Sequence, residues 1–144
     1  MTASASEFGL NAGRARSRAR EGLVSGDVRA LLRVEGFAAF AGSLACYAHA
    51  GFSWPAFALL VLAPDLSIFA YLAGPRVGAI IYNVAHTYAA AVTLTFAGFV
   101  GGVPAATAIG LIWIAHIGFD RALGYGLKYP TSFGNTHLGR IGRH

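Results

Sequence analysis

The fold is decided by residues 36–119, which read GFAAFAGSLACYAHAGFSWPAFALLVLAPDLSIFAYLAGPRVGAIIYNVAHTYAAAVTLTFAGFVGGVPAATAIGLIWIAHIGF. Asp65 and Arg76 are the only charged side chains in this stretch. Over the whole chain of 144 residues, 56% are hydrophobic and 12% are charged, whereas soluble domains carry about 25% charged residues. A water-exposed surface cannot be built from such a stretch, so the sequence predicts one compact integral membrane unit and excludes a large multidomain enzyme.

Glycines and prolines divide the apolar region into four segments, each near the length of about 20 residues that a membrane-spanning helix needs. We expect these spans at about 34–52 (or from 30), 54–73, 77–100 and 104–123. The segments lack sustained apolar/polar alternation and are about twice the length of a barrel strand. The predicted fold class is therefore all-α: a polytopic membrane protein with four transmembrane helices in a compact bundle.

The cations predict how this bundle is oriented. All 11 Lys and Arg residues lie before the first span, in the Gly74–Arg76 turn, or at and after the inner end of the last span, while the loops 51–53 and 101–103 have none. Cytoplasmic loops retain Lys and Arg, so both termini are expected in the cytoplasm. Within this arrangement we expect a basic, disordered tail at 1–28, the bundle at 29–124 and a basic cytoplasmic segment at 125–144.

Ionisable side chains collect in the cytoplasmic half of the predicted bundle. Counting 1.5 Å per residue places Asp65, His86 and His116, from three different spans, at similar depths. Asp120 follows His116 by one helical turn on the same face, and Glu35 enters at the inner end of the first span. Charged groups in a membrane normally face the bundle interior and pair there, so we expect these side chains to converge.

Carboxylates and imidazoles in this combination are ligands for zinc, iron or manganese. We therefore predict Asp65, His86 and His116 as ligands of one divalent metal. Asp120 or Glu35 would complete the ligand set or act as the general base on a water whose pKa the metal lowers towards 7.

The neighbours of this cluster have further predicted roles. Tyr82 and Asn83 are expected to support the ligands, and Arg121 and Lys128 to hold an anionic head group. Asn83 also fits a plain interhelical hydrogen bond. Pro64 frees a backbone carbonyl beside Asp65, which is either a packing kink or part of the site. The C-terminal 20 residues either cap the cytoplasmic mouth of the bundle or lie along the membrane interface.

The residues leave several functions open. The favoured one is metal-dependent hydrolysis or another modification of a lipid-like substrate. The same side chains could carry protons or small ions, could act as interhelical hydrogen bonds in a non-catalytic subunit of a larger membrane complex, or could ligate haem b through His86 and His116. Cys46 is the single cysteine, which excludes a disulfide framework, and the glycines match no nucleotide-binding spacing. The expected partners are the lipid bilayer, a lipid-like substrate and other membrane subunits, and no nucleic acid.

Several motifs resemble a bacterial membrane-protein family catalogued as domain of unknown function 4260. They are APDLS at 63–67, YLAGPRVG at 71–78, YN at 82–83, HTY at 86–88, AHIGFDR at 115–121, GYGLKYPT at 124–131 and THLGR at 136–140. The resemblance covers about residues 31–143. It implies a small integral membrane protein of bacteria and no established activity. Together with the four predicted spans, we expect a multi-pass protein of the bacterial inner membrane.

Overall fold

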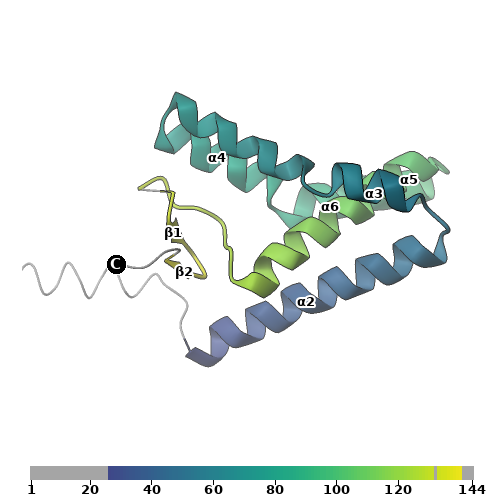
Figure 1. Cartoon of the computed structure of the whole chain (residues 1–144), viewed down its shortest axis with the longest axis horizontal. Coiled ribbons are helices and arrows are strands. Elements are labelled where there is room, and N and C mark those ends of the chain that lie inside the picture. Colours follow the sequence, from purple (N-terminus) through teal and green to yellow (C-terminus); the bar gives the residue numbers. More distant parts are fainter. Residues whose placement is uncertain (1–25, 132, 141–144) are drawn as a thin grey trace, which may run out of the picture.

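The computed structural model describes residues 26–131 and 133–140, and most of these residues are helical (Figure 1). In chain order the elements are α2 (Gly26–His49), α3 (Trp54–Leu60), the 3-10 helix η1 (Ala63–Ala73), α4 (Pro75–Ala85), α5 (Tyr88–Val100), α6 (Pro104–Leu123), β1 (Asn135–Thr136) and β2 (Gly139–Arg140). Among the described residues, four stretches are long and apolar enough to span a membrane: Gly26–His49, Trp54–Ala73, Pro75–Val100 and Pro104–Leu123. The predicted helical class and the four candidate spans are confirmed.

The bounds of the first and last spans follow from their capping residues. α6 has the predicted bounds, because Pro104 fits the first turn of a helix and Gly124 ends the helix in the left-handed region, at φ 97°. α2 begins at Gly26, earlier than predicted, and Asp27 in its first turn complements the positive end of the helix dipole. The predicted tail at 1–28 thus overlaps α2 at its end, and its residues 1–25 lie outside the described part of the chain.

The other two spans are interrupted near their middle, and the expectation of continuous helices there is wrong. α3 ends at Leu60, whose carbonyl would have needed the N–H that Pro64 lacks, and the chain resumes at Ala63 as the tighter helix η1. The second interruption separates Ala85 from Tyr88, with Thr87 extended at φ −98° and ψ 136°. Pro64 marks the first break in the sequence, whereas no Gly or Pro marks the second.

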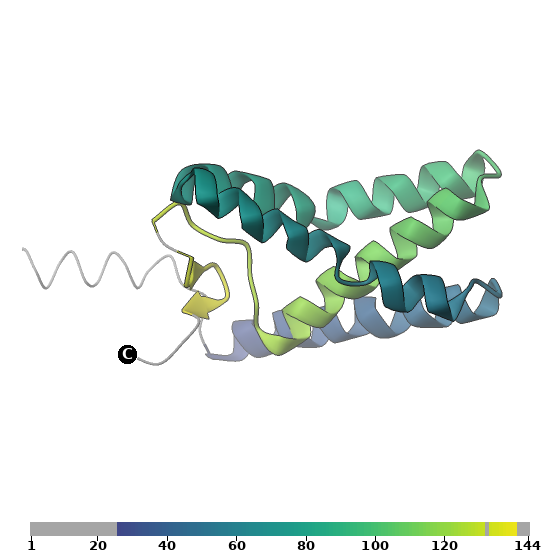
Figure 2. The same cartoon turned by 45° about the horizontal axis from the view of Figure 1, so that its top comes forward.

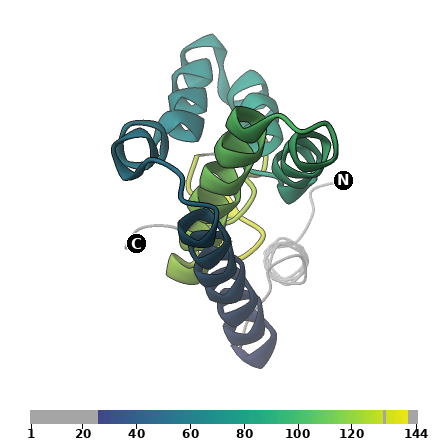
Figure 3. The same ribbon diagram turned by 90° about the vertical axis from the view of Figure 1, so that its right-hand side faces the viewer.

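The central helix of the bundle is α6, which packs along α2 on one side and against α5 on another (Figure 3). α4 and η1 form a separate antiparallel pair joined by the turn at Gly74. The crossing of α2 and α6 is close because both helices have a glycine there. A Cβ atom on Gly118 would lie 2.6 Å from the backbone nitrogen of Phe40, and one on Gly36 would collide with Arg121. Small residues at such crossings are typical of helix packing in membranes.

The two ends of the bundle differ in charge. The α2–α3 and α5–α6 connections lie at one end, and the start of α2, the Gly74 turn and the β-hairpin lie at the other (Figure 2). All the cations of the described residues are at or near this second end. Between the ends the surface is strongly apolar, with Leu59 and Leu72 80% and 90% exposed. Such a surface is suited to lipid and not to water.

The C-terminal segment folds back over the second end of the bundle. β1 and β2 pair antiparallel with Thr136 opposite Gly139, and Lys128 forms a further bridge to Thr136. Leu138 and Thr136 are fully buried. The described residues of this segment, 125–131 and 133–140, thus pack against the bundle, and their small hairpin had no signal in the apolar pattern of the sequence.

Candidate metal centre

Each of the two helix breaks contributes one side chain to the same polar group. Asp65 follows Pro64 in the first turn of η1, and His86 caps the C-terminal end of α4. His116 and Asp120 come from uninterrupted α6, where a spacing of four residues puts them on one face. The four side chains therefore reach one place from three of the candidate spans.

The ligand atoms of these four residues all lie within 4.8 Å of one another. The Nε2 atoms of His86 and His116 are 3.1 Å apart. Asp65 Oδ1 is 3.5 Å from His86 Nε2 and 3.6 Å from His116 Nε2. Asp120 Oδ2 lies slightly farther from the same two nitrogens, at 3.7 and 3.9 Å. Both imidazoles are buried, and the carboxylates of Asp65 and Asp120 are 39% and 17% exposed.

These distances fit a divalent cation at the middle of the group. Metal–ligand bonds of about 2.0–2.1 Å in tetrahedral geometry place neighbouring ligand atoms roughly 3.4 Å apart. The separations among Asp65 and the two histidines lie on either side of that value, and the distances from Asp120 to the two histidines exceed it by about 0.3–0.5 Å. The residues present could therefore hold one metal ion, with Asp120 as the outermost donor.

The orientation of His86 is fixed by Tyr82, one turn earlier on α4. His86 Nδ1 lies 2.9 Å from the Tyr82 carbonyl, and the two rings stack with centroids 3.7 Å apart and an angle of 10° between them. A carbonyl oxygen only accepts, so Nδ1 carries the hydrogen, and Nε2 of the neutral ring presents its lone pair to the group. Metal-binding histidines are typically oriented in this way, by a hydrogen bond from the second nitrogen.

His116 faces that lone pair directly. Because His86 Nε2 carries no hydrogen in the neutral ring, the 3.1 Å approach requires either a proton donated by His116 or a cation shared by both nitrogens. Two carboxylates border the same point and strengthen the requirement for positive charge. The chemistry of the donor set is thus that of a metal site or a proton relay.

The break in the third span is closed by side chains of α6. Trp113 Nε1 donates to the Ala85 carbonyl at 2.6 Å, and Arg121 Nη2 donates to the His86 carbonyl at 3.0 Å. In a continuous helix these carbonyls would accept from residues four positions later. Backbone that leaves the helix at membrane depth needs such partners, because lipid offers none.

A pocket of about 290 Å³ adjoins the group on the side of the C-terminal segment. Its lining includes Asp65, Tyr82, Asp120 and Lys128. Tyr82 donates from its hydroxyl to Asp120 Oδ2 at 3.4 Å. The ammonium of Lys128 lies 4.5 Å from the centre of the Tyr82 ring and donates to the Phe133 carbonyl at 3.2 Å. Burial lowers the pKa of the Lys128 amine to about 8, so it is mostly a cation at pH 7.

The other predicted site residues have different places. Glu35 is exposed on α2 and is not a member of the group. Asn83 turns to the C-terminal segment, where it accepts from the Lys128 N–H at 2.7 Å and donates to the Lys128 carbonyl at 2.9 Å. Arg121 is buried, and its guanidinium donates hydrogen bonds to the backbone carbonyls of His86 and Tyr125. We therefore assign Arg121 to the support of the backbone and not to a head group.

The arrangement does not fit the haem alternative. Two axial imidazoles on opposite sides of an iron need about 4 Å between their nitrogens, twice a bond of about 2 Å, whereas these nitrogens are 3.1 Å apart. Two carboxylates also occupy the space that a macrocycle would need.

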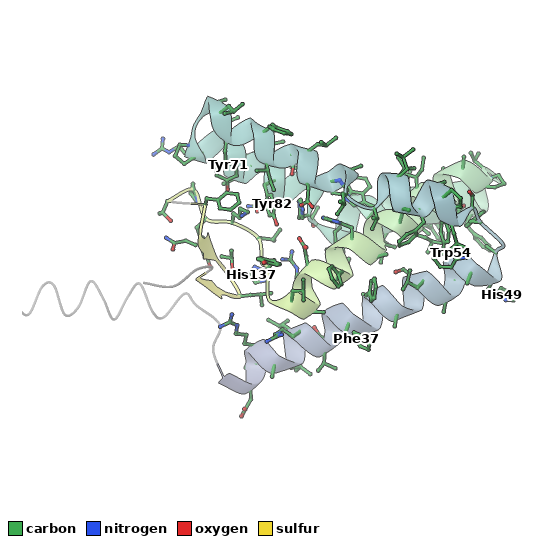
Figure 4. The ribbon with its side chains drawn as sticks, in the orientation of Figure 1. Phe37, His49, Trp54, Tyr71, Tyr82 and His137 are labelled. Atoms are coloured by element: carbon green, nitrogen blue, oxygen red, sulfur yellow. The ribbon has the colours of Figure 1, made fainter. Side chains whose placement is uncertain are left out.

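Trp113 was missed by the sequence analysis, although it precedes His116 by three residues and so lies on a neighbouring part of the same helix face. Tyr82, in contrast, was expected beside the ligands and is in contact with His86 and Asp120. Figure 4 shows Tyr82 at the end of the bundle that contains His137, far from His49 and Trp54 at the other end.

Comparison with known proteins gives the family and no activity. A model of the family described as "Domain of unknown function (DUF4260)" matches residues 29–141, which include every residue of the polar group and of the adjoining pocket. Neither the curated proteins nor the solved structures contain a match.

Proposed function

The chain belongs to the DUF4260 family, and we propose that it is an intramembrane metal-dependent enzyme that hydrolyses or otherwise modifies a lipid-like substrate. The observation that carries this proposal is the position of the group beside a pocket. Two buried imidazoles and two carboxylates converge on one point, and both carboxylates also line a pocket of about 290 Å³. A purely structural cluster would have no need of that space.

Three of the four side chains would act as metal ligands, and the fourth would act as the general base. Asp65, His86 and His116 have the shortest mutual distances and would hold the ion. Asp120 is the most distant donor and accepts a hydrogen bond from Tyr82, so it is placed to exchange a proton with a molecule in the pocket. Glu35 has no part in the proposal, because it is exposed on α2.

The proposed reaction is hydrolysis of an ester. The metal would lower the pKa of water and polarise the carbonyl of the ester. Asp120 takes a proton from the attacking water, a bond forms between the water oxygen and the acyl carbon, and the bond from that carbon to the alcohol oxygen breaks. Asp120 then returns the proton to the departing alcohol oxygen, which leaves a fatty acid and an alcohol.

The substrate would enter from the cytoplasmic leaflet, since we place both chain termini in the cytoplasm and the pocket at the same end of the bundle. This orientation is supported by the confinement of the cations to that end. It follows that we propose the bacterial inner membrane as the location of the protein.

Metal analysis of detergent-purified protein tests the proposal. After incubation with Zn²⁺, Mn²⁺ or Fe²⁺ and removal of the excess, wild-type protein should retain about one ion per chain, and His86→Ala and His116→Ala should retain none. His49→Ala is the matched control, because His49 is an exposed histidine at the opposite end of the bundle, and it should retain the ion. Asp65→Asn keeps the shape of the side chain but removes its charge, and it should also lose the ion. Loss of the ion from this near-isosteric variant would show that the loss does not come only from misfolding.

Each outcome has a defined meaning. Wild-type protein that remains monodisperse but binds none of the three ions overturns the proposal. Retention of the ion by His86→Ala and His116→Ala, or its loss from His49→Ala as well, would show binding outside the cluster.

A proton carrier is the second candidate, and the short approach of the two imidazoles favours it. Nitrogens 3.1 Å apart can pass a proton between them, and Asp65 and Asp120 flank the pair as proton acceptors. Proteoliposomes that contain the metal-free protein would distinguish the two functions. A proton flux that is abolished by His116→Ala would favour the carrier.

A further inference from the structure

Two hollows of similar size are lined by neighbouring residues, one by Pro64 and the other by Asp65. The polar pocket described above includes Asp65 in its lining, and an apolar groove of about 280 Å³ includes Pro64. The groove is lined by Leu60, Ala63, Pro64, Ile109, Ile112 and Trp113. It therefore occupies the first helix break, where α3 gives way to η1 against α6.

α6 fixes the order of the groove, the metal group and the pocket. Ile112 lines the groove, His116 belongs to the group, and Asp120 borders the pocket, each one helical turn after the last. At 1.5 Å per residue, the distance along the helix from Ile112 to Asp120 is about 12 Å. A single molecule could thus reach from an apolar environment, past the metal group, to a polar one.

The charges of the polar side favour an anion. A divalent cation would balance the two negative charges of Asp65 and Asp120, and neutral imidazoles would add no charge. Lys128, the only cation among the described residues that line either hollow, then leaves an excess of one positive charge. Its side chain is positioned by the Phe133 carbonyl at 3.2 Å and by the Tyr82 ring, so the charge is held at the pocket and does not move freely in solvent.

From this order and this charge we infer that the substrate is an anionic lipid, with its acyl chain in the groove at Pro64 and Trp113 and its head group at Lys128. The inference rests on the proposed function and deepens it. It places the junction between chain and head, where an ester carbonyl lies in a glycerolipid, next to the metal group. Lys128 acts as a specificity residue for the head group and takes no part in the bond cleavage.

Trp113 provides a direct probe of the groove. The chain has two tryptophans, and Trp54 lies at the end of the bundle opposite the polar pocket, so Trp54→Phe leaves Trp113 as the single tryptophan, which is excited selectively at about 295 nm or above. This variant, loaded with Zn²⁺ as in the metal analysis and held in an unbrominated maltoside detergent, is titrated with phosphatidylglycerol or phosphatidylcholine carrying the same brominated chains. Bromine quenches tryptophan at contact distance, and the two lipids differ by one net negative charge.

We expect saturable quenching of Trp113 at a phosphatidylglycerol concentration about tenfold below that needed for phosphatidylcholine. Lys128→Gln should abolish this preference because it removes the positive charge, and Lys128→Arg should keep it because it retains the charge. Both variants keep the hydrogen bonds between the backbone of residue 128 and Asn83. Arg76→Gln is the matched control, since it removes an exposed cation at the same end of the bundle, and it should keep the preference. In Trp113→Phe the remaining Trp54 should respond equally to both lipids.

Equal quenching of Trp113 by the two lipids, or a preference that Lys128→Gln leaves unchanged, would overturn the inference. Free inorganic phosphate should not reverse the quenching, because it has no chain for the groove, and reversal would show that the anion alone is recognised. Metal content measured on the same samples separates the two proposals. Protein that binds metal without lipid preference contradicts only the lipid inference, and protein with the preference but without metal contradicts the enzyme.

Discussion

Replacement of Asn83 by Ala should release the C-terminal segment from α4. The Asn83 amide makes two hydrogen bonds to the backbone of Lys128, at 2.7 and 2.9 Å, and Lys128 is only 5% exposed. A hydrogen bond contributes about 0.5–1.5 kcal/mol, so the loss of both lowers the opening free energy of the segment by about 1–3 kcal/mol. A decrease of this size in the opening free energy should accelerate amide exchange at Lys128 by about 5- to 150-fold.

Hydrogen exchange measured by mass spectrometry in detergent checks this prediction. Asn135→Ala is the control, because among the described residues the Asn135 side chain donates to the exposed Thr131 hydroxyl and not to Lys128, and it should change exchange at Lys128 by less than about threefold. Peptides within α6 should exchange at the wild-type rate in both variants. Unchanged exchange at Lys128 in Asn83→Ala would refute the reasoning, because the segment would then be held by its other contacts.

Three further predictions concern the orientation, the pH dependence and the helix packing. Reporter fusions after His144 and within the loop 101–103 should report opposite compartments, and reports from the same side would show that the number of spans is wrong. Burial lowers the pKa of Lys128 to about 8, so its charge is present below that pH and is lost above it. The preference of Trp113 quenching for phosphatidylglycerol should therefore decline between about pH 7 and pH 9.5 in the Trp54→Phe protein, and a constant preference would contradict the role of the ammonium. Gly118→Ala should lower the free energy of unfolding in detergent by about 1–3 kcal/mol, because the added carbon would lie 2.6 Å from the Phe40 nitrogen, while Gly42→Ala, which meets no atom within 4 Å, should not lower it.

Much of the fold could be predicted, because the length of an apolar stretch and the Gly and Pro residues at its ends are local properties of the sequence. Pro104 and Gly124 delimit α6 as expected. The break after Ala85 could not be predicted in this way, because its cause is distant in sequence. Trp113 and Arg121 supply donors to the carbonyls that the break releases, and nothing at His86 or Thr87 signals that these partners will be there.

The candidate site was more accessible to prediction than its surroundings. Polar residues in apolar helices are few, and counting along the helices brings Asp65, His86 and His116 to one level, where the structure also has them. The depth of a residue along a helix does not determine in which direction around the helix axis its side chain points. For this reason Glu35 was expected near the group, although it is exposed. The C-terminal hairpin depends on a left-handed glycine, Gly139 at φ 122°, and on pairing that has no periodic signal.

The origin of the donors on two broken helices and one straight helix has a thermodynamic consequence. An ion bound by all three would act as a cross-link between segments that the two breaks separate. Binding to the folded state alone would add RT ln(1 + [L]/Kd) to stability, about 2.7 kcal/mol when the free ion is at 100 times its Kd. The same event would set the shapes of the groove and the pocket, because Pro64 and Asp65 are adjacent residues that border one hollow each. The supply of metal ions would then govern how well the protein admits its lipid as well as how long it stays folded.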